Sequence, residues 1–334
     1  MAKTHQELET QFREARSRMA SGTIDGEQYN SASRLDSLEK SIRMLGETAD
    51  VELYRHFPVA AVAVLESHFK LTVSTIVNAG SPYLERGLAL AKDRIKSTAV
   101  DFLPILHRKS VTVGELVAHS LPFNSIGSLE TALGTLLGEP FKNLVRDSIY
   151  LYDQRREFGE KARLIDDVDA LWKSLAATIE RRHILAHEAA TNYSISHAEA
   201  LEAVKSVKAV TSSVDSILWA TVWKDEPLTQ YEMNVKAWST YSTTRVLLAA
   251  SLRTALSIAT ADGERKRFAT LHLAWKRASV AWTNWEEEEF QMGSIRPYVT
   301  ALARNHARAE RLKEIDHWIQ RRRPEGRQKL QRSS

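Results

Sequence analysis

Residues 168–188 read VDALWKSLAATIERRHILAHE and join a periodic apolar pattern to a dense polar cluster. The apolar residues recur at three- and four-residue steps, the spacing of one buried face of an α-helix; they are Val168, Leu171, Trp172, Leu175 and Ile179. The pattern then runs into the polar cluster at residues 181–188 (RRHILAHE). Farther on, Ser196 with Glu199 three positions later forms a capping box, which predicts the start of another helix. The polar cluster is therefore expected near a helix end beside a loop, within reach of a substrate.

The composition of the 334 residues predicts an all-α protein, because Gly and Pro occur only 13 and 8 times. The length exceeds that of one ordinary core and predicts two helical domains with appendages. The chain has no cysteine, which excludes disulfides, thiolate metal sites and a cysteine nucleophile. The sequence suggests neither a signal segment nor an apolar run of membrane-spanning length, so we expect a cytoplasmic protein without a membrane partner.

Positive charge is concentrated at one end of the sequence. The net charge is +4, and residues 317–334 hold six Lys or Arg and one Glu, which leaves −1 for residues 1–316. This basic stretch is either a solvated chain end or a segment that attracts phosphate groups without specificity.

Four segments are expected along the chain. Residues 1–49 read as a helical hairpin arm, with a turn at residues 22–26 (GTIDG). Residues 50–222 predict a helical bundle, and KDEP at residues 224–227 marks a boundary. Residues 227–318 are expected to form a second, small helical domain. The composition changes near this boundary, because seven of the eight tryptophans lie at or beyond Trp219. Residues 319–334 form the basic tail.

Arg182, His183 and His187 fit the pattern of Arg, then Asn, His or Asp, then three free positions and His. This signature resembles that of the HEPN superfamily of all-α domains, many of which are metal-independent ribonucleases. Residues 54–70 (YRHFPVAAVAVLESHFK), which include Glu66, resemble the long first helix of these domains. Residues 121–141 (LPFNSIGSLETALGTLLGEPF) resemble the segment that precedes the motif helix in one bacterial branch. The resemblance covers about residues 50–222 and implies a HEPN-type helical bundle.

The resemblance also implies an endoribonuclease of the toxin or anti-phage abortive-infection type, acting on RNA with no metal or other cofactor. Such cleavage needs a base for the 2′-hydroxyl proton, a donor to the phosphate oxygens and an acid for the leaving 5′-oxygen. We expect His187 to transfer protons, Arg182 to clamp the phosphate, and His183 to orient the substrate or the other histidine. Arg181 and Glu188 are candidate substrate-binding residues. The expected products are a 2′,3′-cyclic phosphate and a 5′-hydroxyl.

Arg182 and His187 are five helical steps apart, or roughly 140° around the axis, so a straight helix does not aim both at a single point. Either the helix distorts or two chains share one cleft. HEPN ribonucleases generally act as dimers, and we therefore expect a homodimer in which the two motifs face each other. The resemblance leaves open whether an antitoxin partner exists, as it does for some relatives.

Four further stretches occur in the order and spacing of the LprI-type lysozyme-inhibitor domain: residues 229–234 (TQYEMN), 271–277 (LHLAWKR), 293–297 (GSIRP) and 308–312 (RAERL). That family carries paired cysteines, and Lys236 stands where one is expected, which puts lysozyme inhibition in doubt. The resemblance implies a helical domain that senses or binds a protein or an envelope-derived ligand. One helical face there is expected to be core: Leu271, Trp275, Ala278, Trp282 and Trp285.

Three other interpretations stay open. His183 and His187 share a helix face and could hold Zn²⁺, but the sequence offers no evident third ligand, so we expect no metal site. The chain could instead be a non-catalytic dimeric interaction protein with a HEPN-like bundle. A cytosolic lysozyme-binding protein is the third alternative.

Overall fold

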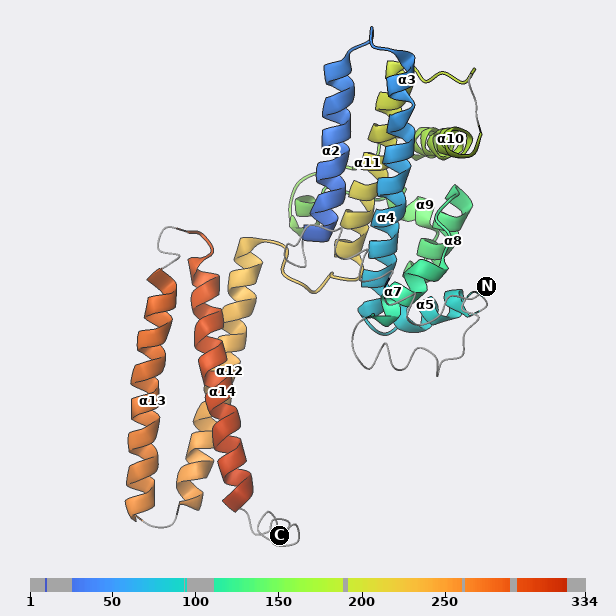
Figure 1. Cartoon of the computed structure of the whole chain (residues 1–334). Helices are drawn as coiled ribbons and strands as arrows, with labels where there is room; N and C mark the ends of the chain where they lie inside the picture. Colours follow the sequence, from blue (N-terminus) through green and yellow to red (C-terminus); the bar gives the residue numbers. More distant parts are fainter. Residues whose placement is uncertain are drawn as a thin grey trace. The chain divides into compact units, whose positions relative to one another are not determined.

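The computed structural model describes residues 26–92, 111–188, 192–259, 262–288 and 293–322, together with Thr10 and Arg94. Within these residues every regular element is a helix, and one isolated antiparallel bridge joins Ile149 to Arg163. The predicted all-α class is confirmed. The chain divides into two compact units, Met1–Lys224 and Asp225–Ser334 (Figure 1).

The described helices of the first unit are α2 (Gly26–Leu45), α3 (Val51–Tyr54), α4 (His56–Asn78), α5 (Tyr83–Ala91), α7 (Val113–Ser120), α8 (Ile126–Leu137), α9 (Phe141–Arg146), the 3₁₀ helix η1 (Leu151–Arg155), α10 (Val168–His187) and α11 (His197–Ala220). Helix α4 is central, because it contacts α2, α3, α5, α7, α8, α10 and α11 (Figure 1). Helix α2, which the sequence assigns to the N-terminal arm, packs on both α4 and α11.

A run of aromatic side chains ties α4 to α10 through the core. The ring of Phe69 lies 6.1 Å from those of both Phe123 and Phe141, and Phe141 lies 5.9 Å from Trp172 on α10. The indole N–H of Trp172 donates to Oε1 of Glu130 on α8 at 2.8 Å, which satisfies the one polar atom of that ring. These contacts fix α10 against the bundle and so determine where its polar end lies.

Helix α4 buries more of its circumference than its apolar stripe predicts. The sequence suggests that Glu66 and His68 both fall off the stripe, yet His68 is only 1% exposed. Helix α4 is covered on several sides, so a polar side chain off the main stripe is buried as well. By length and hydropathy, Val51–Asn78 would also pass as a membrane span, although from the sequence we expect no such run. Half of its most apolar window is buried inside the first unit, as in the core helix of a globular protein.

Local sequence signals position several helix ends. The predicted capping box of Ser196 and Glu199 is present at the start of α11, and Ser125 caps α8 in the same way with Ser128. Gly138 ends α8 with φ of 85°, a left-handed conformation that glycine adopts without strain.

The sequence pattern also predicts single helices over residues 83–108 and 141–158, and both differ in the structure. The helix expected at residues 83–108 ends as α5 at Ala91, and most of the remainder lies outside the described residues. The helix expected at residues 141–158 is instead two short pieces, α9 and η1. The chain leaves the helix because the N–H of Tyr150 donates to the carbonyl of Ala162, and the carbonyl of Ile149 accepts from the Ser216 hydroxyl.

The second unit consists of α12 (Gln230–Ile258), α13 (Asp262–Glu288) and α14 (Arg296–Arg322). Helix α14 packs along α12 and also contacts α13. The buried apolar core is small, and it consists of Leu248, Ala255, Ile315 and Ile319.

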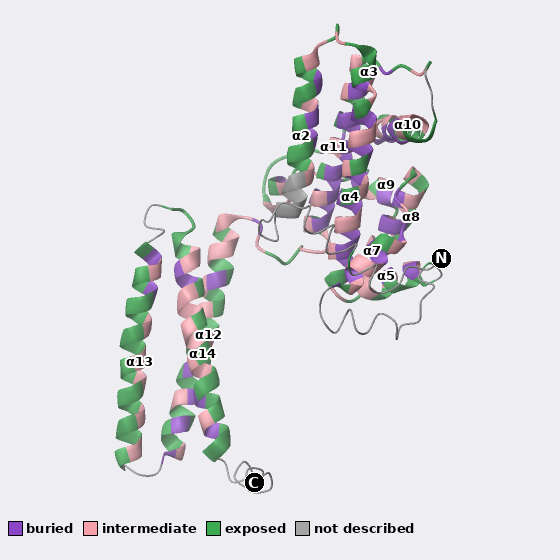
Figure 2. Cartoon of the chain, in the orientation of Figure 1, coloured by how far each residue is buried: buried purple, intermediate pink, exposed green. Residues whose placement is uncertain are grey.

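Helix α13 is rotated away from the orientation that its sequence suggests. Of the face expected to be core, Trp275 packs against it, but Leu271, Trp282 and Trp285 are 63%, 61% and 56% exposed. Thr283 and Glu287 are buried instead, and Figure 2 shows the largely exposed surface of α13. Glu287 forms ion pairs with two arginines of α14, described below, and these polar contacts orient the helix.

Candidate functional site

The polar cluster lies in the last two turns of α10. The helix begins at the N-cap Asp167, whose carboxylate accepts from the N–H groups of Asp169 and Ala170 at 3.0 and 2.9 Å. Apolar side chains such as Leu175 and Ile179 bury its first part. The helix continues unbroken to His187, so Arg182 and His187 remain on different sides of one regular helix.

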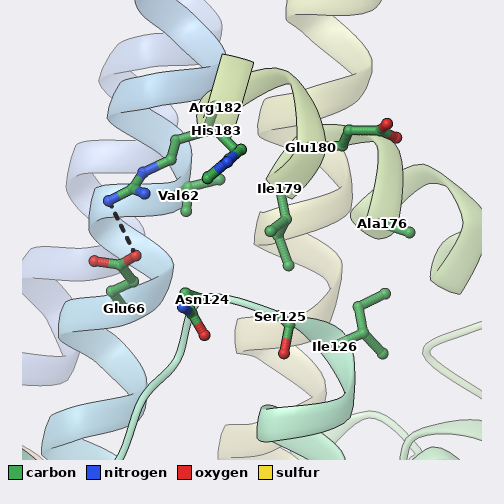
Figure 3. A pocket seen from close by; sticks show the side chains of 10 residues that line it. All are labelled: Val62, Glu66, Asn124, Ser125, Ile126, Ala176, Ile179, Glu180, Arg182 and His183. Atoms are coloured by element: carbon green, nitrogen blue, oxygen red, sulfur yellow. Dashed lines mark ion pairs between the residues drawn. The ribbon is translucent and has the colours of Figure 1, made fainter. Parts of the chain in front are cut away.

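A surface pocket of about 320 Å³ opens beside this end of α10. Its walls come from α4, from the start of α8 and from α10 (Figure 3). The lining residues are Val62, Glu66, Asn124, Ser125, Ile126, Ala176, Ile179, Glu180, Arg182 and His183. Two of the predicted catalytic residues, Arg182 and His183, therefore share one pocket.

Arg182 extends across the pocket toward α4, as Figure 3 shows. Its Nη2 atom lies 3.4 Å from Oε1 of Glu66, and the two side chains are 27% and 25% exposed. The guanidinium is therefore accessible to a ligand, and a carboxylate fixes its direction. Because a guanidinium carries five N–H donors, this single contact leaves others for phosphate oxygens.

Arg181 points away from the pocket and pairs with α11. Its Nη2 donates to Oε1 of Glu199 at 2.9 Å, while its Nη1 is buried and has no hydrogen-bond partner among the described residues. Hydrogen bonding by Ser196 and the nearby Arg181 lower the pKa of the Glu199 carboxyl. Arg181, predicted to bind substrate, thus links the end of α10 to the start of α11 and does not line the pocket.

The two histidines lie next to each other on successive turns of α10. Their ring centroids are 4.9 Å apart with an interplanar angle of 56°, and both residues are exposed. His183 lines the pocket, whereas His187 does not. Glu188, the other predicted substrate-binding residue, follows the helix as its exposed C-cap. One chain therefore brings Arg182 and His183 together and leaves His187 on the adjacent surface.

Periodicity alone did not identify the opposite wall of the pocket. The sequence favours Asn124 or Ser125 as the cap of the next helix, and Glu66 as part of the first long helix. Each lies far from Arg182 in the sequence, and their proximity depends on how α4 and α8 pack against α10. No local pattern contains this information.

A metal site finds little support in the geometry. In the described parts of the chain, no group of three or more His, Asp or Glu side chains is arranged to hold a metal ion. The adjacent rings of His183 and His187 would supply only two ligands, whereas zinc sites usually have at least three from protein.

Comparison with known proteins gives no relative. No family model matches the chain, and neither a curated protein nor a solved structure matches it significantly. The chemistry of the site is therefore the basis for a functional proposal.

Proposed function

We propose that the protein is a metal-independent endoribonuclease that binds an RNA phosphate at the pocket beside the end of α10. The observation that carries this proposal is the shared pocket of Arg182 and His183, where an oriented guanidinium lies beside an exposed imidazole. Arginine matches the geometry of phosphate oxygens, and histidine exchanges protons near neutral pH.

In the proposed reaction the ribose 2′-oxygen attacks the adjacent phosphorus. A histidine takes the 2′-hydroxyl proton while the O2′–P bond forms, the P–O5′ bond breaks, and an acid protonates the leaving 5′-oxygen. Arg182 stabilises the negative charge that builds up on the phosphate oxygens, and Glu66 holds its guanidinium in place. The products are a 2′,3′-cyclic phosphate and a 5′-hydroxyl.

Two copies of the chain would complete this site. His187 lies outside the pocket lined by Arg182 and His183 of its own chain. A second α10 docked end to end would supply His187 to the first pocket, so that base and acid come from different copies. Under this proposal the second unit acts as a sensor that binds a protein or envelope-derived ligand.

One observation favours a second candidate, a non-catalytic interaction module. Arg182 is paired with Glu66, and a guanidinium whose charge is already neutralised attracts phosphate less strongly. In that case α10 would serve only to dimerise the chain.

Expression in a bacterial host distinguishes the two candidates. The wild type is expected to arrest growth, whereas His187→Ala is tolerated; His306→Ala, an exposed histidine on α14, is the matched control and should remain toxic. Purified wild type should cut RNA equally with and without EDTA and leave 2′,3′-cyclic phosphate ends. If wild type and His187→Ala are equally harmless and the purified protein leaves RNA intact, the ribonuclease proposal is wrong and the interaction module is supported.

A further inference from the structure

Helix α13 carries an apolar stripe on the side that does not face α14. On a helical projection the stripe residues fall within about 80° of one another, and all are exposed: Leu271, Ala274, Ala278, Trp282 and Trp285. The rings of Trp282 and Trp285 lie 5.1 Å apart, so the two tryptophans form one continuous apolar surface. Exposed tryptophans of this kind are typical of interaction surfaces.

Contacts on the side of α13 that faces α14 hold this stripe outward. Oε1 of Glu287 lies 3.1 Å from Nη2 of Arg304, and its Oε2 lies 3.5 Å from Nη2 of Arg296. Trp275 packs beside the core of the unit, with the guanidinium of Arg311 5.8 Å from its ring centroid. Turning the stripe toward α14 would bury it only by breaking both ion pairs of Glu287.

Size and charge along the stripe are self-complementary. Small residues, Ala274 and Ala278, lie in the middle, whereas the large side chains Leu271 and Trp285 lie toward the two ends. Arg267 is exposed before the stripe and Glu288 is exposed after it, so the N-terminal end is basic and the C-terminal end is acidic. A parallel neighbour would place like charges together, and an antiparallel copy places opposite charges together.

We propose that two copies of the chain pair antiparallel through α13, with the two-fold axis at Ala278. In this register Ala278 meets its own counterpart, Leu271 of one copy lies over Trp285 of the other, and Ala274 makes room for Trp282. Arg267 of each copy lies within one residue of the level of Glu288 of the other. The helices approach closely at the alanines, and the tryptophans cover the ends. This contact is independent of the ribonuclease proposal, because it uses no residue of the pocket.

The charge pattern favours a second copy over an anionic surface. Glu286 and Glu288 lie at the end of the helix beside the tryptophans, and such acidic side chains repel nucleic acid and acidic lipid. The exposed Glu288 is instead favourable opposite a basic segment such as residues 265–267 (RKR) of another α13.

The absence of native cysteine permits a direct test in the full chain. Ala278→Cys should form a disulfide between copies under mild oxidation, since the axis brings the two Cβ atoms together. Lys276→Cys is the control: it is also exposed but lies about 160° around the helix from the stripe, so it should not cross-link. Adding Trp282→Ser to Ala278→Cys should slow cross-linking at least tenfold at unchanged helical content by circular dichroism. Equal cross-linking at both positions, or at neither, overturns the proposal.

Charge reversal tests the antiparallel register separately. In the Ala278→Cys background, Arg267→Glu alone and Glu288→Arg alone should each cross-link more slowly, because each places like charges together across the axis. A mixture of the two variants should recover the faster rate, since every pair is then opposite in charge. A mixture no faster than either variant overturns the antiparallel register. Neither readout requires cleavage of RNA, so failure here is distinct from failure of the proposed function.

Discussion

The Nε2 atom of His68 on α4 lies 3.7 Å from Oδ1 of Asp215 on α11. Neither atom has a hydrogen-bond partner among the described residues, and both are buried, although the Asp215 side chain as a whole is 38% exposed. Burial lowers the pKa of His68 to about 4 and raises that of Asp215 to about 7. Near pH 6 both groups are therefore held neutral inside the bundle.

The first prediction concerns the pH dependence of stability. Between its folded pKa of about 4 and its usual value of 6.5, His68 binds fewer protons in the folded chain than in the unfolded chain. Its contribution to the free energy of unfolding is therefore lost as pH falls through this range. Between its usual pKa of 3.8 and its folded pKa of about 7, Asp215 binds more protons in the folded chain. Its contribution to the free energy of unfolding is therefore lost as pH rises through this range. In the wild type the two effects oppose each other.

Single substitutions should separate the two pH dependences of the free energy of unfolding, one from His68 and one from Asp215. In Asp215→Asn the free energy of unfolding should fall on acidification from pH 6.5 to 4, by on the order of 3 kcal/mol from His68. In His68→Leu it should instead fall as pH rises from 4 to 7. Urea unfolding at several pH values measures both. Parallel pH profiles for the two variants would show that the groups do not titrate as inferred.

A second prediction concerns the ion pair at the pocket. Arg182→Lys keeps the charge but loses the planar fork, so cleavage of RNA should fall on the order of 100-fold. Glu66→Gln should retain RNA binding and lower the rate constant of a single turnover about tenfold, because Arg182 loses the group that orients it. Arg253→Ala, an exposed arginine of α12, should leave the rate unchanged. Faster cleavage by Glu66→Gln would mean that Glu66 restrains the proposed activity.

A third prediction tests the crossing of α7 and α4. A Cβ at Gly114 would collide with the carbonyl oxygen of Ser74 and lie 2.8 Å from Oδ1 of Asn78, which accepts from the Gly114 N–H. Gly114→Ala should therefore lower the free energy of unfolding by about 2 kcal/mol. The matched control is Gly127→Ala in α8, where a Cβ meets nothing within 4 Å and helix propensity should favour alanine. Equal stability of the two variants by urea unfolding would contradict the tight crossing.

A fourth prediction tests the link between α10 and α11. Glu199 caps α11 through Ser196 and also accepts from Arg181, so Glu199→Gln should lower the free energy of unfolding by about 1 kcal/mol at pH 7. Since the pKa of Glu199 is lowered, this difference should shrink as pH falls below its usual 4.5. Glu202→Gln, an exposed residue of the same helix, is the control and should change stability little.

Local sequence patterns predict many helix ends of the first unit. The features that they do not predict depend on contacts between helices that are distant in the sequence. The capping box of Ser196 and Glu199 and the turn at Gly138 depend on neighbours in sequence, and both are present. The pairing of Arg182 with Glu66 depends on how two distant helices pack, which periodicity does not encode. Spacing identifies the apolar face of α13 but does not show whether a neighbouring helix covers it. The ion pairs of Glu287 with two arginines of α14 turn the opposite side of α13 toward α14 and leave the stripe exposed.

Helix α14 is the neighbour against which α13 is chiefly packed in the described part of the second unit. Much of that contact is ionic, while α12 and α14 share the small apolar core. Salt screens partly exposed charges far more than it weakens apolar burial. Backbone amides of α13 should thus exchange with solvent deuterium sooner than those of α12, and increasingly so as ionic strength rises. Local unfolding of the unit would then begin with α13, which detaches from α14 while α12 and α14 stay packed together.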